Sequence, residues 1–161
     1  MKIIYTKKGE AIKVDDEDYQ ALSKRPWHIH TEGYAKSYYR QNGKPTSVYM
    51  HRLLMSPQKG LVVDHINGDK TDNQKSNLRI CTIAENIRGA KLSNKNTTGC
   101  KGVTKISGKS KWVATIRVNF ERICLGTFDN FNDAASAYKS ASLKYHGIYS
   151  PYCKPNELPN Q

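Results

Sequence analysis

The sequence predicts an α+β protein assembled from small modules rather than one large domain. Strand-like runs recur along its 161 residues, hydrophobic residues make up only 37%, and helical periodicity is confined to a few capped segments. A chain of this length with so few apolar residues is not expected to build a single large core. We therefore expect a small N-terminal β-rich region, a central strand–strand–helix core, and a C-terminal three-stranded antiparallel sheet packed on one helix.

The N-terminal stretch reads as two short strands followed by a helix. The runs KIIYT and EAIKV have strand-like composition. Asp15 can cap the helix that follows, with Val14 and Tyr19 forming a hydrophobic staple. The acidic side chains of the first helical turn are expected to interact with the positive end of the helix dipole. These residues are Asp16, Glu17 and Asp18.

The aromatic-rich stretch RPWHIHTEGYAKSYYR alternates in polarity and turns at Gly33, which predicts a β-hairpin. His28 and His30 lie two residues apart within it. We assign them a structural or base-contacting role in preference to metal binding, because no third ligand is near them in the sequence.

The run VVDHINGDKTDNQKSNLRICTIAEN, residues 62–86, is the densest in functional residue types. Two apolar residues lead into Asp64 and His65, a polar loop follows, and LRICT forms a second strand. Thr82 and Glu85 have the spacing of a capping box, which starts a helix. Three polar residues of the loop are expected to be turn formers. They are Asp69, Asp72 and Asn73.

The order of these elements places three side chains where metal-assisted hydrolysis needs them. Asn86 falls in the first helical turn and can face a cation, to which Asp64 supplies a hard anionic oxygen. A neutral imidazole at His65 can accept a proton from water as the water attacks phosphorus.

This run, with the His-Arg-Leu-Leu of residues 51–54 before it, resembles the catalytic region of phage-type HNH homing endonucleases, which have a two-strand, one-helix (ββα) metal fold. The resemblance implies that His65 is the general base and that Asp64 and Asn86 bind one divalent metal. It also implies that Asn77, 12 residues after His65, hydrogen-bonds to backbone and holds the loop that carries His65.

The expected metal is Mg²⁺ or Mn²⁺. Asn86, 21 residues after His65, replaces the last His of the family name, and this oxygen ligand shifts the preference away from zinc. His51 and Arg52 are supporting residues, with packing or phosphate contact favoured for His51 and catalysis as the alternative. No structural zinc is expected, because the four cysteines lack any CxxC or CxxH spacing.

Beyond the polar segment KLSNKNTTG, the sequence predicts a compact β-meander and a helix. KGVTKIS, SKWVATIRVN and RICLGTF are the three strands. Asn130 can cap the helix, with Asp133 at its third position, and Gly147 ends it. The expected apolar or aromatic helix face comprises Phe131, Ala134, Ala135, Tyr138, Ser142 and Tyr145.

Residues 97–147 resemble the plant ethylene-response-factor (APETALA-type) DNA-binding domain, which is also found fused to HNH nucleases. In the middle strand the alternate residues Trp112 to Val118 can pack under the helix, which leaves a basic face for the major groove. The contacts carried over from the resemblance are Lys101, Thr104, Thr115, Arg117 and Arg122, and charge alone adds Lys105 and Lys111. Thr104 and Cys124 stand where the family usually has Arg and Trp, so its base preference is not transferred.

The charge distribution favours a polyanionic partner. The net charge is +12, with 11 basic and 6 acidic residues in 1–60, 4 of each in 61–90, and 11 and 4 in 91–161. A neutral centre between two basic arms fits a site that holds a cation beside a phosphate.

We therefore expect a site-preferring DNA endonuclease that uses one divalent metal, leaves 5'-phosphate and 3'-hydroxyl ends, and nicks as a monomer. Its partner is double-stranded DNA, with no obligatory protein partner. No membrane-length apolar run or secretory signal is present, so a cytoplasmic location in a bacterium or phage-infected cell is expected. The alternatives are a catalytically inactive DNA-binding transcriptional regulator and an RNA-binding module.

The expected organisation has five parts. They are an N-terminal β-rich DNA-contacting region (1–60), the HNH nuclease core (61–90), a linker (91–99), the sheet-plus-helix DNA-binding domain (100–148) and a tail (149–161).

Overall fold

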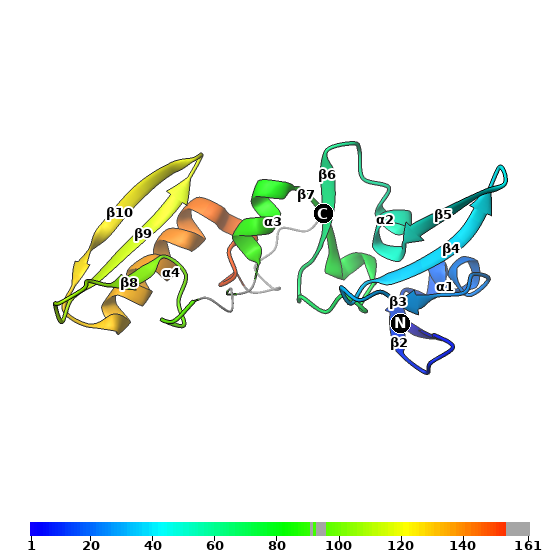
Figure 1. Cartoon of the computed structure of the whole chain (residues 1–161), viewed down its shortest axis with the longest axis horizontal. Coiled ribbons are helices and arrows are strands. Elements are labelled where there is room, and N and C mark those ends of the chain that lie inside the picture. Colours follow the sequence, from blue (N-terminus) through cyan, green and yellow to red (C-terminus); the bar gives the residue numbers. More distant parts are fainter. Residues whose placement is uncertain (91, 93–95, 154–161) are drawn as a thin grey trace. The chain divides into compact units, whose positions relative to one another are not determined.

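The computed structural model of the chain describes residues 1–90, 92 and 96–153. It confirms the α+β class, because the described residues form small antiparallel sheets with a few helices (Figure 1). The chain divides into two compact units, Met1–Ile83 and Ala84–Gln161. This division falls before the expected linker, and residues 61–83 share a unit with the N-terminal region.

The first unit is built from three small sheets and three helical segments. Its strands are β1 (Lys2–Tyr5), β2 (Ala11–Val14), β3 (His28–Ile29), β4 (Ala35–Gln41), β5 (Lys44–Tyr49), β6 (Leu61–His65) and β7 (Leu78–Thr82). Its helices are α1 (Asp16–Leu22), α2 (Met50–Met55) and the 3-10 turn η1 (Lys75–Asn77). A small core joins the N-terminal elements through Ile4, Ile12, Val14, Leu22, Trp27, Ala35 and Met50.

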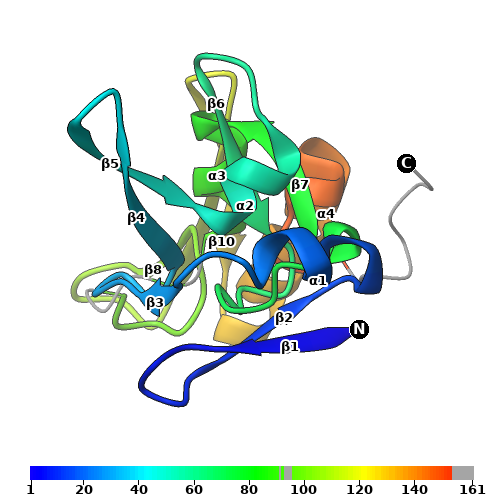
Figure 2. The same cartoon turned by 90° about the vertical axis from the view of Figure 1, so that its right-hand side faces the viewer.

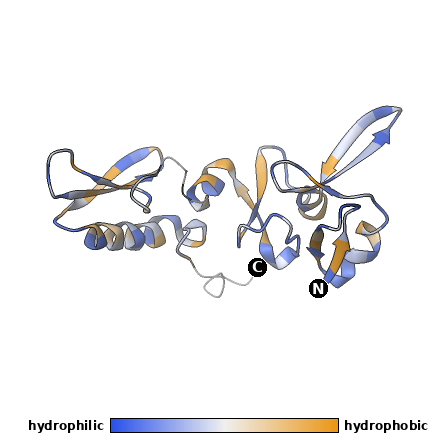
Figure 3. Ribbon diagram, turned by 60° about the horizontal axis from the view of Figure 1, so that its bottom comes forward, coloured by the Kyte–Doolittle hydropathy of each residue, from blue (hydrophilic) through white to orange (hydrophobic). Residues whose placement is uncertain are grey.

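The predicted hairpin at Gly33 is confirmed, and a second hairpin follows that the sequence analysis did not predict. β3 pairs with β4 across Gly33, and β4 pairs in turn with β5. Asn42 and Gly43 both have positive φ, as a two-residue Asn-Gly hairpin turn requires. The β4–β5 hairpin extends away from the rest of the unit (Figure 2), and its outer part is hydrophilic (Figure 3).

Asp15 corrects one prediction, because its carboxylate does not cap α1. Asp15 occupies the N-cap position without a side-chain capping bond. Its oxygens instead accept hydrogen bonds from the backbone N–H of Lys75 at 2.7 Å and from Gln74 Nε2 at 3.1 Å. The Lys75 ammonium also binds the carboxylates of Glu17 and Asp18. Tertiary contacts with the β6–β7 loop therefore use the acidic groups that were expected to serve the helix end.

The second unit matches the predicted meander and helix. Its elements are α3 (Ile83–Gly89, which begins at the last residue of the first unit), β8 (Val103–Lys105), β9 (Trp112–Val118), β10 (Glu121–Phe128), α4 (Phe131–His146) and the 3-10 turn η2 (Gly147–Tyr149). The strand order is β10-β9-β8, and α4 covers one face of this sheet (Figure 1). Asn130 Oδ1 accepts the Asp133 N–H at 2.9 Å, and Gly147 ends α4, both as predicted.

The buried face of α4 differs in part from the predicted face. Ala134, Tyr138 and Ser142 are buried as expected. Tyr145 is exposed, whereas Ala141 and His146 are buried. His146 Nε2 lies 3.1 Å from the Arg117 backbone oxygen, so the last turn of α4 is hydrogen-bonded to the end of β9.

The expected linker and tail are only partly described. Residues 91, 93–95 and 154–161 lie outside the described residues. Asn96 Oδ1 accepts the N–H groups of Thr98 and Gly99, and Thr98 Oγ1 donates to the Val103 carbonyl, so residues 96–99 form a turn against β8. None of the described helices is long and apolar enough to cross a membrane.

Asp15→Ala is expected to lower the free energy of unfolding by about 1–3 kcal/mol, because it leaves the Lys75 N–H without its charged acceptor. The measurement is urea denaturation. Asp16→Ala is the matched control, since the Asp16 carboxylate is exposed and contacts only the N-terminal amine among the described residues. Equal losses in the two variants would contradict the anchoring role of Asp15.

Candidate active site

The residues expected to carry chemistry lie on the antiparallel β6–β7 pair. The register places Asp64 opposite Arg79 and His65 opposite Leu78. Arg79 donates to Asp64 Oδ2 from Nε at 2.9 Å and from Nη2 at 2.6 Å. Among the described residues these are the only donors to the Asp64 carboxylate, so its Oδ1 is available to another partner.

Asn77 closes the loop that follows His65. Its side-chain Oδ1 accepts the Asn67 N–H at 3.0 Å, and its Nδ2 donates to the Asp72 carbonyl at 2.8 Å. The Asn77 carbonyl accepts the Ile66 N–H at 2.9 Å. These are backbone contacts of the kind that the family resemblance implies for this residue.

The other polar residues of the loop form its turns, as expected. Asp69 Oδ1 accepts from the N–H and the hydroxyl of Thr71, and Asp72 accepts from Asn67 Nδ2 and from the Gln74 N–H. Asn73 is buried, with no hydrogen-bond partner for either side-chain atom among the described residues.

His65 ends β6 inside a cluster of aromatic rings. Its ring centroid lies 5.2 Å from that of His51 in an edge-to-face arrangement and 5.8 Å from that of Tyr34. His51 also stacks on Tyr49 at 5.5 Å and lies 5.0 Å from Tyr34. We call these four residues, Tyr34, Tyr49, His51 and His65, the aromatic cluster.

Both imidazoles of the aromatic cluster are buried in a way that favours their neutral forms. Burial, with the nearby His65 and Arg52, lowers the pKa of His51 to about 4. Burial also lowers the pKa of His65, against the opposing influence of the Asn73 side chain and the neighbouring carboxylates. His51 Nδ1 and His65 Nε2 have no hydrogen-bond partner among the described residues. A neutral imidazole keeps one nitrogen as a proton acceptor, so each ring can serve as a base when that nitrogen is reached by a donor.

Tyr34 and Tyr49 were not among the residues predicted from the sequence. Tyr34 follows the turn at Gly33 and contacts His65 through tertiary packing, and Tyr49 ends β5 and contacts His51. The available signal was the tyrosine content of residues 34–49, of which the predicted hairpin, residues 25–40, included Tyr34 but not Tyr49. His28 stacks on Tyr38 at 4.7 Å, and His30 lies edge-on to Tyr49, so both make the structural contacts expected of them.

The residues on β6 fit a divalent cation in part. HNH nucleases generally use a divalent metal. Asp64 Oδ1 can supply one hard oxygen, and Mg²⁺ is commonly bound through one or two carboxylates plus waters and substrate phosphates. No group of three His, Cys, Asp or Glu that could hold a metal occurs in the described part of the chain. Asn86 lies on α3 in the second unit, so its pairing with Asp64 stays a prediction.

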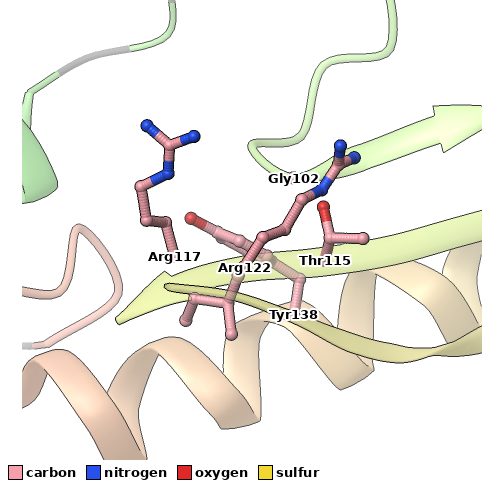
Figure 4. Close-up of a pocket in the computed structure, with 6 residues that line it drawn as sticks. Gly102, Thr115, Arg117, Arg122 and Tyr138 are labelled. Atoms are coloured by element: carbon pink, nitrogen blue, oxygen red, sulfur yellow. The ribbon is translucent and has the colours of Figure 1, made fainter. Parts of the chain in front are cut away.

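A second candidate site lies on the β8–β9–β10 sheet, on the face away from α4. The register pairs Arg117 with Arg122 and Thr104 with Val113. We call this surface the arginine face and define it as Thr104, Thr115, Arg117 and Arg122. A pocket of about 290 Å³ opens there, and Figure 4 shows both guanidinium groups projecting away from the helix.

Gly102 lines this pocket and allows a close approach of the chain to β9. A Cβ at Gly102 would lie 2.2 Å from the Thr115 carbonyl oxygen, and its φ is +65°, so only glycine fits.

The three lysines predicted to contact DNA do not stand free beside the arginine face. Lys101 Nζ donates to the Arg88 and Ala90 carbonyls, and burial lowers its pKa. Lys111 forms a 2.9 Å ion pair with Asp129. Lys105 pairs with Trp112, whose side chain packs toward the helix, and its ammonium lies over the Trp112 ring.

Comparison with known proteins assigns the chain to a family. A model of the HNH endonuclease family matches residues 55–88, which include β6, β7 and the start of α3. The chain is therefore an HNH-type DNA endonuclease. More particularly, it belongs to the same family as Protein 3.8 of Escherichia phage T7, with 33% identity over 94 residues that cover 58% of this chain and 77% of the phage protein.

Other similar proteins cover between 58% and 94% of the chain. An uncharacterised HNH endonuclease of Acanthamoeba polyphaga mimivirus is 26% identical over 157 residues, 94% of this chain and 77% of that protein. An ethylene-responsive transcription factor of Arabidopsis thaliana is 35% identical over 101 residues, 58% of this chain and 60% of its own length. A solved structure of the HNH homing endonuclease I-HmuI matches 93% of this chain and 84% of its own, with 22% identity and a TM-score of 0.38.

Asn77→Ala is expected to lower the free energy of unfolding by about 1–3 kcal/mol, because it leaves the Asn67 N–H and the Asp72 carbonyl without their partner. It should also reduce nuclease activity, since the loop after His65 loses its cross-link. Urea denaturation measures the free energy of unfolding, and a plasmid-nicking assay measures the nuclease activity. Ser76→Ala, an exposed change in the same 3-10 turn, should match the parent in both. A fully active, fully stable Asn77→Ala protein would refute the role of this amide.

The stability of the first unit is expected to fall as the pH drops from about 6.5 to 4. The unfolded chain binds a proton at His51 near pH 6.5, whereas the folded protein resists it until about pH 4. The free energy of unfolding therefore has its full value above pH 6.5, and the His51 contribution lowers it by up to about 3 kcal/mol as the pH falls to 4. Urea midpoints between pH 4 and 7.5 should show a shallower slope for His51→Leu. An unchanged slope would contradict the burial of a neutral imidazole.

Proposed function

We propose that this chain is a site-preferring DNA endonuclease in which His65 is the general base and Asp64 and Asn86 hold one divalent metal, Mg²⁺ or Mn²⁺. It hydrolyses a phosphodiester to leave 5'-phosphate and 3'-hydroxyl ends. With one such site in the chain, a monomer nicks one strand. The observation that carries the proposal is a buried His65 imidazole at the end of β6, next in sequence to a carboxylate whose Oδ1 accepts no hydrogen bond from the described residues.

As water attacks phosphorus and the P–O3' bond breaks, His65 accepts a proton from that water. Burial against Tyr34 and His51 favours the neutral ring that this role requires. The Asn77 contacts support this step, since they fix the loop immediately after His65 and limit the orientations of the ring.

The two carboxylate oxygens of Asp64 have different roles in the proposed site. Oδ2 is held by Arg79, which leaves Oδ1 for the cation. The bound metal supplies charge stabilisation for the pentavalent phosphorus and the leaving 3' oxygen. Asn86 supplies a neutral oxygen, so the protein donors fit Mg²⁺ or Mn²⁺ better than zinc.

Two basic surfaces support duplex DNA as the substrate. On the arginine face, Arg117 and Arg122 can bind guanine edges or phosphates, and Thr104 and Thr115 can donate hydrogen bonds. In the first unit, the exposed tyrosines of the β4–β5 hairpin have cations over their rings. Lys36 lies over Tyr38, and Arg25, which precedes β3, lies over Tyr39. Arg52, exposed on α2 beside His51, adds a cation near the aromatic cluster.

The second candidate function is a DNA-binding regulator that cleaves nothing. The Asp64–Arg79 ion pair favours it, because an arginine already neutralises the proposed metal ligand. Against it stands the full set of Asp64, His65, Asn77 and Asn86 in the sequence. Cleavage assays separate the two functions directly.

Supercoiled plasmid is expected to be nicked with Mg²⁺ and left intact with EDTA, and His65→Ala should cut at least about 100-fold more slowly, the range for loss of a general base. His28→Ala is the matched control, a partly buried histidine of the same unit that stacks on Tyr38 rather than on a member of the aromatic cluster. DNA ligase should reseal the nick if the ends are 5'-phosphate and 3'-hydroxyl. Parent-like cleavage by His65→Ala would exclude this general base, and DNA binding without cleavage by the parent would support the regulator.

A further inference from the structure

The turn between β9 and β10 holds a phenylalanine in a conformation that favours glycine. Val118 pairs with Glu121, so Asn119 and Phe120 alone form the turn. Their φ values are 47° and 69°, the left-handed pair of a type I′ hairpin. Asn suits the first position, but the second is one where glycine is preferred, because a side chain there crowds the backbone. Phe120 therefore costs the fold free energy.

Phe120 gives no packing in return. It is 92% exposed, the highest exposure among the large hydrophobic side chains of the described residues. The other two phenylalanines pack at the core of the same unit, where Phe131 meets Trp112 edge-to-face and Phe128 lies against Gly126. Exposure of a single apolar side chain is ordinary, but exposure at a strained backbone position, outside the core of the described residues, points to a role in binding a partner.

The hairpin end presents Phe120 from a rigid base. The strands before and after the turn are paired without interruption from Val118–Glu121 to Thr115–Cys124. Ile116 and Ile123 are packed in the core, and His146 is hydrogen-bonded to the Arg117 carbonyl. With both strand ends fixed and only two turn residues, the ring is held out from the sheet.

Two arginines near the turn indicate the kind of partner that Phe120 would meet. Arg117 and Arg122 stand directly opposite each other, one residue inside the paired ends of the strands, and within the described residues neither forms an ion pair. Two cations side by side repel unless an anion lies between them. A partner that offers both flat apolar faces and closely spaced anions is nucleic acid, with its stacked bases and phosphates.

We propose that Phe120 is an apolar wedge that inserts against a base step of duplex DNA, while Arg117 and Arg122 bind the flanking phosphates. This inference rests on the proposed DNA binding by the arginine face and adds to it a local unstacking of the duplex. Apolar side chains carried on a basic scaffold unstack base steps in this way and kink the duplex.

The test uses the full chain with His65→Ala, so that DNA stays intact, and a duplex recovered from a randomised pool by binding to that protein. Binding is measured by fluorescence anisotropy, and unstacking by 2-aminopurine placed at successive positions of the duplex. Phe120→Gly should weaken binding by about tenfold or more, the effect of losing one aromatic–base contact. It should also abolish the 2-aminopurine signal, and raise Tm by about 4 °C as the backbone strain is relieved. Phe120→Tyr keeps the ring and should bind within about threefold of the parent.

The arginines separate failure of the wedge from failure of the proposed DNA-binding face. If Arg117→Ala with Arg122→Ala weakens binding while Phe120→Gly leaves both affinity and 2-aminopurine signal unchanged, the face stands and the wedge is refuted. If the arginine changes have no effect, or no duplex is retained, both are refuted. Dimerisation that Phe120→Gly abolishes, with DNA binding intact, would assign the ring to a second copy of the chain and also overturn the wedge.

Discussion

The side-chain amide of Asn77 joins two points of the β6–β7 loop, Asn67 and Asp72, whose own side chains are also hydrogen-bonded to each other. It accepts a hydrogen bond from one backbone segment and donates one to another, while the Asn77 carbonyl continues the pairing of Ile66 beyond β6. The end of β6 is thereby fixed, and with it His65. The same loop is bound from outside by Asp15, so the nuclease core and the N-terminal helix share one hydrogen-bonded network. An amide suits this position because it both donates and accepts without introducing charge beside a carboxylate-rich loop.

Local chemistry was predictable from the sequence, and contacts between distant segments were not. The Asn130 cap and the strands of the meander depend on local spacing, and both appear as expected. Asp15 fails as a cap because a backbone donor 60 residues away competes for its carboxylate. Lys101 is not a free DNA contact for a similar reason, because its ammonium donates to a carbonyl at the end of α3. A sequence shows which groups seek partners, but tertiary packing decides among partners of similar strength.

The environment of His65 shows the same limit. Its position in an Asp-His pair after two apolar residues was sufficient to select it, but the sequence did not indicate that the rings of Tyr34 and His51 would pack against it. This burial favours the neutral imidazole. The aromatic cluster joins the β3–β4 turn, β5, α2 and β6, so the protonation state of His65 depends on how several elements of the first unit pack.

The Asp64–Arg79 ion pair affects the conditions under which the proposed site would bind a metal ion. A carboxylate already matched by a guanidinium presents little net charge, so it attracts a free divalent ion only weakly. A DNA phosphate brings the missing negative charge to the same place. In the proposed mechanism, cation and substrate would each favour binding of the other, and the site would reach its full set of charges only when both are bound. An endonuclease with this arrangement would activate water only once nucleic acid is in place.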